Sequence, residues 1–159
     1  MPSDLAPDVP AHIASFYNVE KHSLLELEPP KHTRIRGLLA RSFTAHTIND
    51  LGPNIDALCR ELCGRFPPEP FDLIKEYSVH IPVIIICRLL GVPQEMAPQL
   101  LRWSHDMVAM YQARRDRALE DQAVKSTNEF TAYLRDLVAQ RQKTSKDDLI
   151  SHLISAQDD

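Results

Sequence analysis

The pair of side chains best suited to chemistry is His32 and Arg36, which are four residues apart in the sequence. On a helix, residues at this spacing project from the same face, so the two side chains could hold one anion between them. Arginine presents a planar set of donors that matches a carboxylate, and histidine adds a donor that titrates near neutral pH. The spacing also fits a solvated basic helix face, because Lys31, Arg34 and Arg41 are close by. The residues alone leave both interpretations open.

The three cysteines are a second candidate group, since Cys59 and Cys63 are also four residues apart and could share a metal ion. Structural zinc commonly takes four ligands from two short-spaced sets, and no second CxxC or HxxxH pattern lies nearby. We therefore predict no metal site and interpret both residues as packing residues. Cys87 lies in an isoleucine-rich segment and is interpreted as a small buried hydrophobe. An odd number of cysteines argues against a disulfide framework and favours a reduced, cytoplasmic protein.

Other common signatures of function are missing from the sequence. Its four glycines are too scattered for a GxGxxG or P-loop pattern, and no GxSxG occurs. A net charge of -4 is not typical of nucleic-acid-binding proteins. The longest apolar run, residues 83–87, is too short to cross a bilayer, and the N-terminus lacks the features of a secretory signal. The carboxylate pairs at 120–121 and 147–148 are interpreted as helix starts or exposed faces, so no catalytic residue is predicted.

The elements that must position these residues are predicted to be helices, because glycine is scarce and twelve prolines mark the corners between apolar stripes. The segment 77–90 has strand-forming isoleucines, but its length and the glycine that follows favour a buried helix. Residues 1–22 are predicted to be mostly loop, with a turn of helix around 12–16, and residues 71–73 a short extended stretch. The other expected helices cover residues 29–42, 51–66, 99–110, 119–137 and 145–153, with Thr44 as a cap of the second and a capping-box-like start of Ser145 and Asp148 for the last.

A longer motif surrounds the His32–Arg36 pair. The run over residues 23–44 reads SLLELEPPKHTRIRGLLARSFT. It resembles the bacterial cytochrome P-450 stretch that reads loosely DPPEHTRLRxLVxxxFT and forms the loop entering the C helix and the C helix itself. Residues 89–93 read LLGVP, which is similar to the close of the family's D–E region, and residues 147–156 read DDLISHLISA, which is similar to its H helix. The resemblance covers roughly residues 10 to 159, with the F helix, F–G loop and G helix in between.

The resemblance implies an all-α fold, the helical portion of a cytochrome P-450 from the C to the H helix. We expect one partial domain over residues 1–159, with residues 1–22 mostly loop and 23–159 forming the C to H region. The sequence has no ExxR pair, no FxxGxxxCxG loop around a cysteine and no oxygen-activating helix pattern. The family's sheet is also expected to be missing.

The function implied by the resemblance is a portion of a haem-dependent monooxygenase that acts on a small organic substrate with O₂. Haem is the implied cofactor, and His32 and Arg36 match the HxxxR positions that bind its propionates. Leu24 and Met107 are expected to approach the substrate. The basic face of Lys31, Arg34 and Arg41 is expected to dock a ferredoxin-type electron donor.

By itself the chain is expected to be inactive, because it lacks the cysteine that ligates the haem iron in the family. The alternative function is a non-catalytic helical binding or self-association module derived from the same family. Helices without their partners expose apolar surface, which would favour a homo-oligomer or a domain swap.

Overall fold

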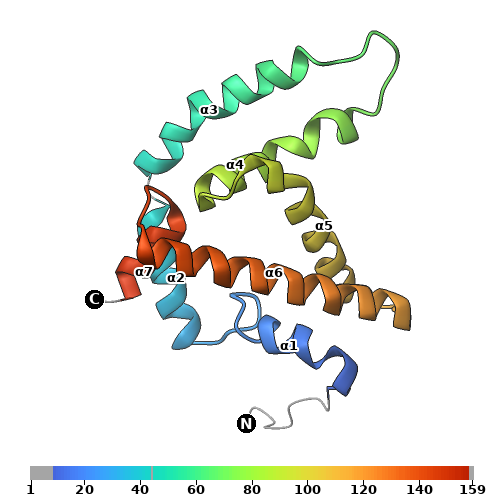
Figure 1. The fold of residues 1–159 in the computed structure, drawn as a ribbon, viewed down its shortest axis with the longest axis vertical. Coiled ribbons are helices and arrows are strands. Elements are labelled where there is room, and N and C mark those ends of the chain that lie inside the picture. Colours follow the sequence, from blue (N-terminus) through green and yellow to red (C-terminus); the bar gives the residue numbers. More distant parts are fainter. Residues whose placement is uncertain (1–8, 44, 158–159) are drawn as a thin grey trace.

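The computed structural model describes residues 9–43 and 45–157, apart from the side chains of residues 41, 42, 45–47 and 157. Within these ranges it contains helices and no strand (Figure 1), so the all-α prediction is confirmed. The α-helices are α1 (Ala14–Glu20), α2 (Lys31–Ser42), α3 (Ala45–Cys63), α4 (His80–Leu90), α5 (Ala97–Val108), α6 (Arg117–Lys143) and α7 (Leu149–Gln157). Short 3-10 turns cover Ala11–Ile13, Gln94–Met96 and Ala109–Tyr111, and a π-helical turn covers Ile74–Ser78.

The long helix α6 is the axis of the arrangement. Its 27 residues begin at a cap in which the Asp116 side chain accepts a hydrogen bond from the backbone N–H of Leu119 at 2.8 Å. Helix α5 packs on one side of α6 and α1 on the other, while α7 lies beside its C-terminal end (Figure 1). Helix α4 packs on α5, α3 packs on α4, and α2 packs on α7. Helix α2, which carries the predicted site, is therefore held mainly by its contact with α7.

The larger hydrophobic core forms around α4. Its fully or largely buried members are Leu58, Leu62, Val83, Ile84, Ile85, Cys87, Val92, Ala97, Leu137 and Ile150. The isoleucine-rich segment is thus a buried helix, as predicted, with Pro82 in its first turn, where a missing backbone N–H costs little. Ile86 is the exception, since it is 49% exposed and lines an open hollow between α4 and α5.

Two predictions of local structure are wrong. The described part of residues 1–22 is mostly helical, because Ile13 and Phe16 are buried against Met110 and the α6 residue Ala123. The extended stretch predicted for residues 71–73 gives way to helix at Leu73. There the Asp72 carboxylate accepts hydrogen bonds from the backbone N–H groups of the next turn, at 2.9 and 3.2 Å. The predicted cap Thr44 lies outside the described residues.

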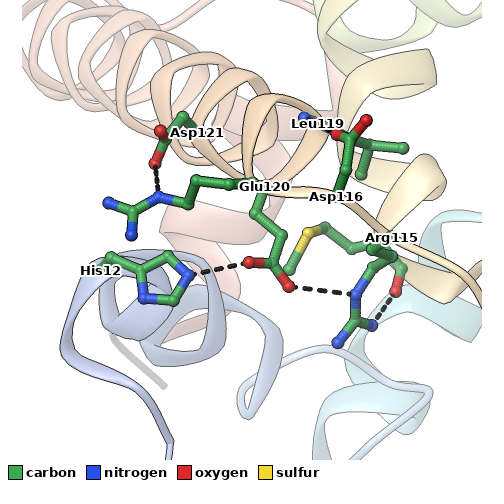
Figure 2. A network of polar contacts seen from close by, with 8 residues as sticks. His12, Arg115, Asp116, Leu119, Glu120 and Asp121 are labelled. Atoms are coloured by element: carbon green, nitrogen blue, oxygen red, sulfur yellow. Dashed lines mark hydrogen bonds and ion pairs between the residues drawn. The ribbon is translucent and has the colours of Figure 1, made fainter.

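A network of polar contacts joins the 3-10 turn Ala11–Ile13 to the start of α6 (Figure 2). The Glu120 carboxylate lies between His12, whose Nε2 is 2.8 Å from Oε2, and Arg115, whose Nε is 3.4 Å from Oε1. Arg115 also donates to the backbone carbonyl of Met110. Hydrogen bonding to His12, then the charges of His12 and Arg115, outweigh desolvation and lower the pKa of Glu120. Arg115 and Glu120, at the start of α6, therefore hold the 3-10 turn that leads into α1.

Replacing His12 with alanine is expected to raise the pKa of Glu120 toward the ordinary glutamate value of about 4.3, because its strongest hydrogen-bonding partner is removed. The measurement is an NMR titration of the Glu120 side-chain carboxyl carbon. Arg115→Gln serves as the comparison and should raise this pKa less, since the Arg115 contact is longer. A larger rise in Arg115→Gln than in His12→Ala would contradict the assignment of His12 as the main partner.

A buried ion pair joins the C-terminal ends of α4 and α6 to the start of α7. Arg141 Nε donates to Asp148 Oδ2 at 2.5 Å, and both side chains are at most 4% exposed. Arg141 Nη2 also donates to the Gly91 carbonyl at 2.6 Å. The other oxygen of Asp148 accepts from the backbone N–H of Ser151 at 2.8 Å and so caps α7. The 147–148 carboxylates were predicted to lie at a helix start or on an exposed face; Asp148 is at the start of α7, but its charge is buried and paired with Arg141, which the sequence did not predict.

The predicted capping-box-like start of the last helix also needs correction. Asp148 itself provides the side-chain cap of α7, while Ser151 Oγ accepts from the backbone N–H of Lys146 at 3.0 Å. Asp148 is in position to do this because Arg141 holds its second oxygen.

Candidate functional site

The predicted anion-binding pair lies on α2. Both His32 and Arg36 are within this helix, four residues apart, so their Cα–Cβ bonds project from one face. His32 is half-buried and Arg36 is exposed. Neither side chain forms a hydrogen bond or ion pair with another residue in the described part of the chain. The helix therefore presents two donors together and leaves both available.

The predicted basic face extends along the same helix. Lys31 and Arg34 are exposed, and each lies within a turn of His32 or Arg36 on α2. The side chain of Arg41 lies outside the described residues. The described end of α2 is thus a cluster of positive groups around the His32–Arg36 pair.

An open cavity of about 290 Å³ lies between the loop after α1 and helices α5 and α6. Its lining residues are Glu20, Ser23, Leu25, Leu100, Ser104, Met107, Val108, Tyr111 and Phe130. Met107 is one of these lining residues, and its contact with a substrate stays a prediction. Leu24 is half-buried and does not line this cavity, whereas its neighbour Leu25 does and is 80% exposed.

Most of the lining of this cavity is apolar, apart from Ser104 on α5 and the polar groups around Glu20. The Glu20 carboxylate, at the last residue of α1, accepts hydrogen bonds from Ser23 Oγ at 2.9 Å and from the Tyr111 hydroxyl. The bond to Glu20, followed by burial, raises the pKa of Tyr111 to about 12, so its phenol stays protonated and donating. Sequence reasoning missed both residues, because they are brought together by the packing of α1 beside α5.

A second, larger hollow of about 430 Å³ lies on the neighbouring face, between α4 and α5. The two hollows meet at α5, because both are lined by Leu100, Ser104 and Phe130. Ile86, on α4, contributes the exposed apolar side chain of this second hollow. Trp103 and Met110 are buried core residues, and the Trp103 indole N–H donates to Glu129 at 2.8 Å.

The cysteines are all free and differ in their surroundings. Cys87 is fully buried, as predicted, and burial raises the pKa of its thiol. Cys59 is half-buried and Cys63 is exposed. Among the described residues, no group of three or more His, Cys, Asp or Glu side chains could hold a metal ion. Over the same residues, no helix has the length and hydropathy needed to span a membrane.

Comparison with known proteins gives consistent relatives. The vitamin D(3) 25-hydroxylase of Pseudonocardia autotrophica is 32% identical over 160 aligned residues, which include the whole chain and 36% of the relative. The erythromycin C-12 hydroxylase of Saccharopolyspora erythraea is 36% identical over 135 residues, or 84% of the chain and 34% of the relative. The chain thus spans about a third of the length of the curated relatives it matches. No protein-family model matches it.

Solved structures agree with the curated relatives. CYP164A2 of Mycobacterium smegmatis, in its ligand-free state, matches with a TM-score of 0.81 and 34% identity over 89% of this chain and 38% of its own. P450BioI, in complex with an acyl carrier protein carrying hexadec-9Z-enoic acid, matches with a TM-score of 0.87 over 94% of this chain and 39% of its own. Its identity is 22%, so it supports the fold alone. The sequence motifs, the helical arrangement and these relatives together show that the chain belongs to the bacterial cytochrome P-450 family, of whose members it matches a helical portion.

Proposed function

We propose that this chain supplies the cofactor-clamping and substrate-covering part of a haem-dependent monooxygenase. The observation that carries the proposal is the pair of donors on α2, four residues apart, with no partner among the described residues. Both side chains suit an anionic carboxylate, and the carboxylates of haem are its propionates. When bound, haem supplies the iron chemistry by which the family oxidises a substrate with dioxygen.

The roles proposed for this chain's residues are binding and covering. His32 and Arg36 donate hydrogen bonds to carboxylates, and their shared helix fixes the spacing of the two donors. Met107, together with Leu25 and Phe130, forms an apolar wall that excludes water from a substrate in the 290 Å³ cavity. Leu24, which is outside that wall, stays a prediction. The substrates named for the relatives differ, so no particular substrate is assigned by similarity.

A partner surface is proposed for the exposed basic end of α2. Lys31 and Arg34 carry no ion pair with a described residue, which leaves their charge available to an acidic electron donor such as a ferredoxin. A cytoplasmic location is part of the same proposal.

The alternative, a self-association module, is supported by exposed apolar side chains. Ile74, Ile86 and Val108 are 66%, 49% and 58% exposed and lie beside the two hollows. Self-association through this surface would require neither haem nor Arg36, and a haem titration therefore separates the two functions.

The test is a haem titration of the chain followed by Soret absorbance, with Arg36→Ala as the variant. Loss of one charge-assisted hydrogen bond, worth about 1.5–3 kcal/mol, should weaken haem affinity by roughly 10- to 150-fold. The control is Arg34→Ala, on the same helix but two residues away and so on a different face, which should leave the affinity unchanged. Haem dimethyl ester, whose propionates are blocked, should bind wild type and Arg36→Ala equally. Equal losses in both arginine variants would rule out a specific clamp.

A further inference from the structure

The Glu20 carboxylate lines the 290 Å³ cavity, in which most of the other lining side chains are apolar. It is half-buried, and both of its hydrogen bonds, from Ser23 and from Tyr111, are made to Oε1. Oε2 accepts no hydrogen bond from any residue that the structure describes. One oxygen of the carboxylate is therefore left with an unused capacity to accept.

No cation compensates the charge of Glu20 within the described residues. Lys21, the nearest cation in the sequence, donates to Asn18 Oδ1 at 2.9 Å instead. The donors that Glu20 does have, a serine hydroxyl and a tyrosine hydroxyl, are neutral. Two other carboxylates do have cationic partners, since Glu120 has His12 and Arg115, and Asp148 has Arg141. The partly buried Asp106 resembles Glu20 in having only neutral donors, but it does not line this cavity. A partly desolvated carboxylate without a cation is costly, and a cationic ligand group would remove that cost.

The other side chains of the cavity indicate what kind of molecule would carry this cationic group. Leu25, Leu100, Met107, Val108 and Phe130 provide the wall, which suits an apolar body. A ligand carboxylate would be repelled by Glu20, and a neutral hydroxyl would gain a hydrogen bond but no charge pairing. The chemistry of the cavity therefore ranks an amine above an alcohol and an alcohol above an acid.

We propose that this cavity selects amphiphilic ligands that carry a protonated amine, whose N–H donates to Oε2 of Glu20 while the apolar body packs on Met107 and Phe130. The proposal rests on the proposed function, because it names the substrate class of the cavity assigned there to the monooxygenase. Tyr111 and Ser23 act as positioning residues, since they hold Oε1 and so direct Oε2 away from themselves.

The test compares three probes with the same chain length: decylamine, decanol and decanoate, each titrated into the protein by isothermal calorimetry at neutral pH. Wild type should bind decylamine at least ten-fold more tightly than decanol, with decanoate the weakest. Glu20→Gln, which keeps the shape and removes the charge, should abolish the preference for the amine and weaken decanol binding much less than decylamine binding. The control is Glu28→Gln, which removes an exposed charge from the loop that follows α1. Glu28 does not line the cavity, so this variant should keep the preference for the amine.

Other outcomes overturn the proposal in distinguishable ways. Wild type that binds decanol as tightly as decylamine overturns amine selection without any variant, and leaves the haem clamp intact. A Glu20→Gln variant that loses all three probes equally assigns Glu20 a purely structural role. Tyr111→Phe, which retains the charge, must keep the ranking of the probes. Absence of binding by all three probes removes both amine selection and the proposed substrate cavity, whereas the haem titration with Arg36→Ala still reports separately on the clamp.

Discussion

Replacing Arg141 with methionine is expected to lower the free energy of unfolding by about 3–5 kcal/mol, because it leaves the buried charge of Asp148 without its partner. The pair is almost fully withdrawn from water, at 4% and 3% exposure. Arg141 also donates to the carbonyl of Gly91, so the substitution removes a second buried hydrogen bond at the same time. The measurement is urea unfolding of wild type and variant, followed by far-ultraviolet circular dichroism.

The control for this variant is Arg117→Met, which breaks an exposed ion pair with Asp121 four residues away on α6. Exposed pairs at this spacing contribute about 0.3–0.5 kcal/mol, so the loss should be several-fold smaller. Similar losses in the two variants would show that the Arg141 contacts do not stabilise the fold more than a surface pair does.

The pH dependence of unfolding gives an independent readout of the same ion pair. Burial raises the pKa of Asp148, but hydrogen bonds from Ser151 and Arg141 and the charge of Arg141 outweigh it, and the net pKa is lowered. The carboxylate therefore stabilises the folded state above the ordinary aspartate pKa of about 4, and this stabilisation is lost as the pH falls below that value through the lowered pKa. In Arg141→Met the free energy of unfolding should fall less steeply as the pH is lowered, because one cause of the lowered pKa of Asp148 is gone.

Replacing Gly91 with alanine is expected to cost at least about 3 kcal/mol for two reasons that act together. Its φ of 67° places it in the left-handed region, which costs a residue with a side chain about 1–2 kcal/mol. An added Cβ would also lie 2.0 Å from Oδ2 of Asp148 and 2.8 Å from its Cβ. The aspartate would have to move, and its bond to Arg141 would be disturbed. The measurement is again urea unfolding.

Gly37→Ala is the matched control for this substitution. Gly37 lies within α2, and an added Cβ there meets no other atom within 4 Å. Alanine favours a helix interior over glycine by about 1 kcal/mol, so this variant should be as stable as wild type or more stable. The double variant Gly91→Ala/Arg141→Met should lose less than the sum of the single losses, since both disturb Asp148. If the two losses in the free energy of unfolding simply added, Gly91 and Arg141 would not act through the same contacts with Asp148.

The sequence predicts that these segments are helices, but it does not predict which face of each helix its neighbours cover. The isoleucines of α4 were predicted to be in a buried helix, and they are, yet Ile86 is 49% exposed in the hollow between α4 and α5. Periodicity identifies an apolar helix without showing which face its neighbours cover. For the same reason residues 1–22 were predicted to be mostly loop, with only a turn of helix around 12–16: the apolar positions of this segment form a recognisable face only once α6 is beside them.

The clamp was the part of the site most accessible to sequence reasoning. His32 and Arg36 are four residues apart, and a helix converts that spacing directly into a shared face. The resemblance then suggested the anion that such a pair would bind. Met107 lines a cavity in the structure, while its predicted approach to a substrate came from the resemblance and stays a prediction.

By itself, the sequence determined the all-α class, the left-handed end of α4 at Gly91 and the position of the donor pair on α2, because each depends on contacts within a few residues. Only the tertiary structure decided that Arg141 and Asp148 are a buried pair, and that Tyr111 meets Glu20 across 91 residues of chain. A carboxylate or a guanidinium has the same local preferences whether it ends in water or in a core. Its charge acquires a structural or a binding role through the distant groups that packing brings beside it.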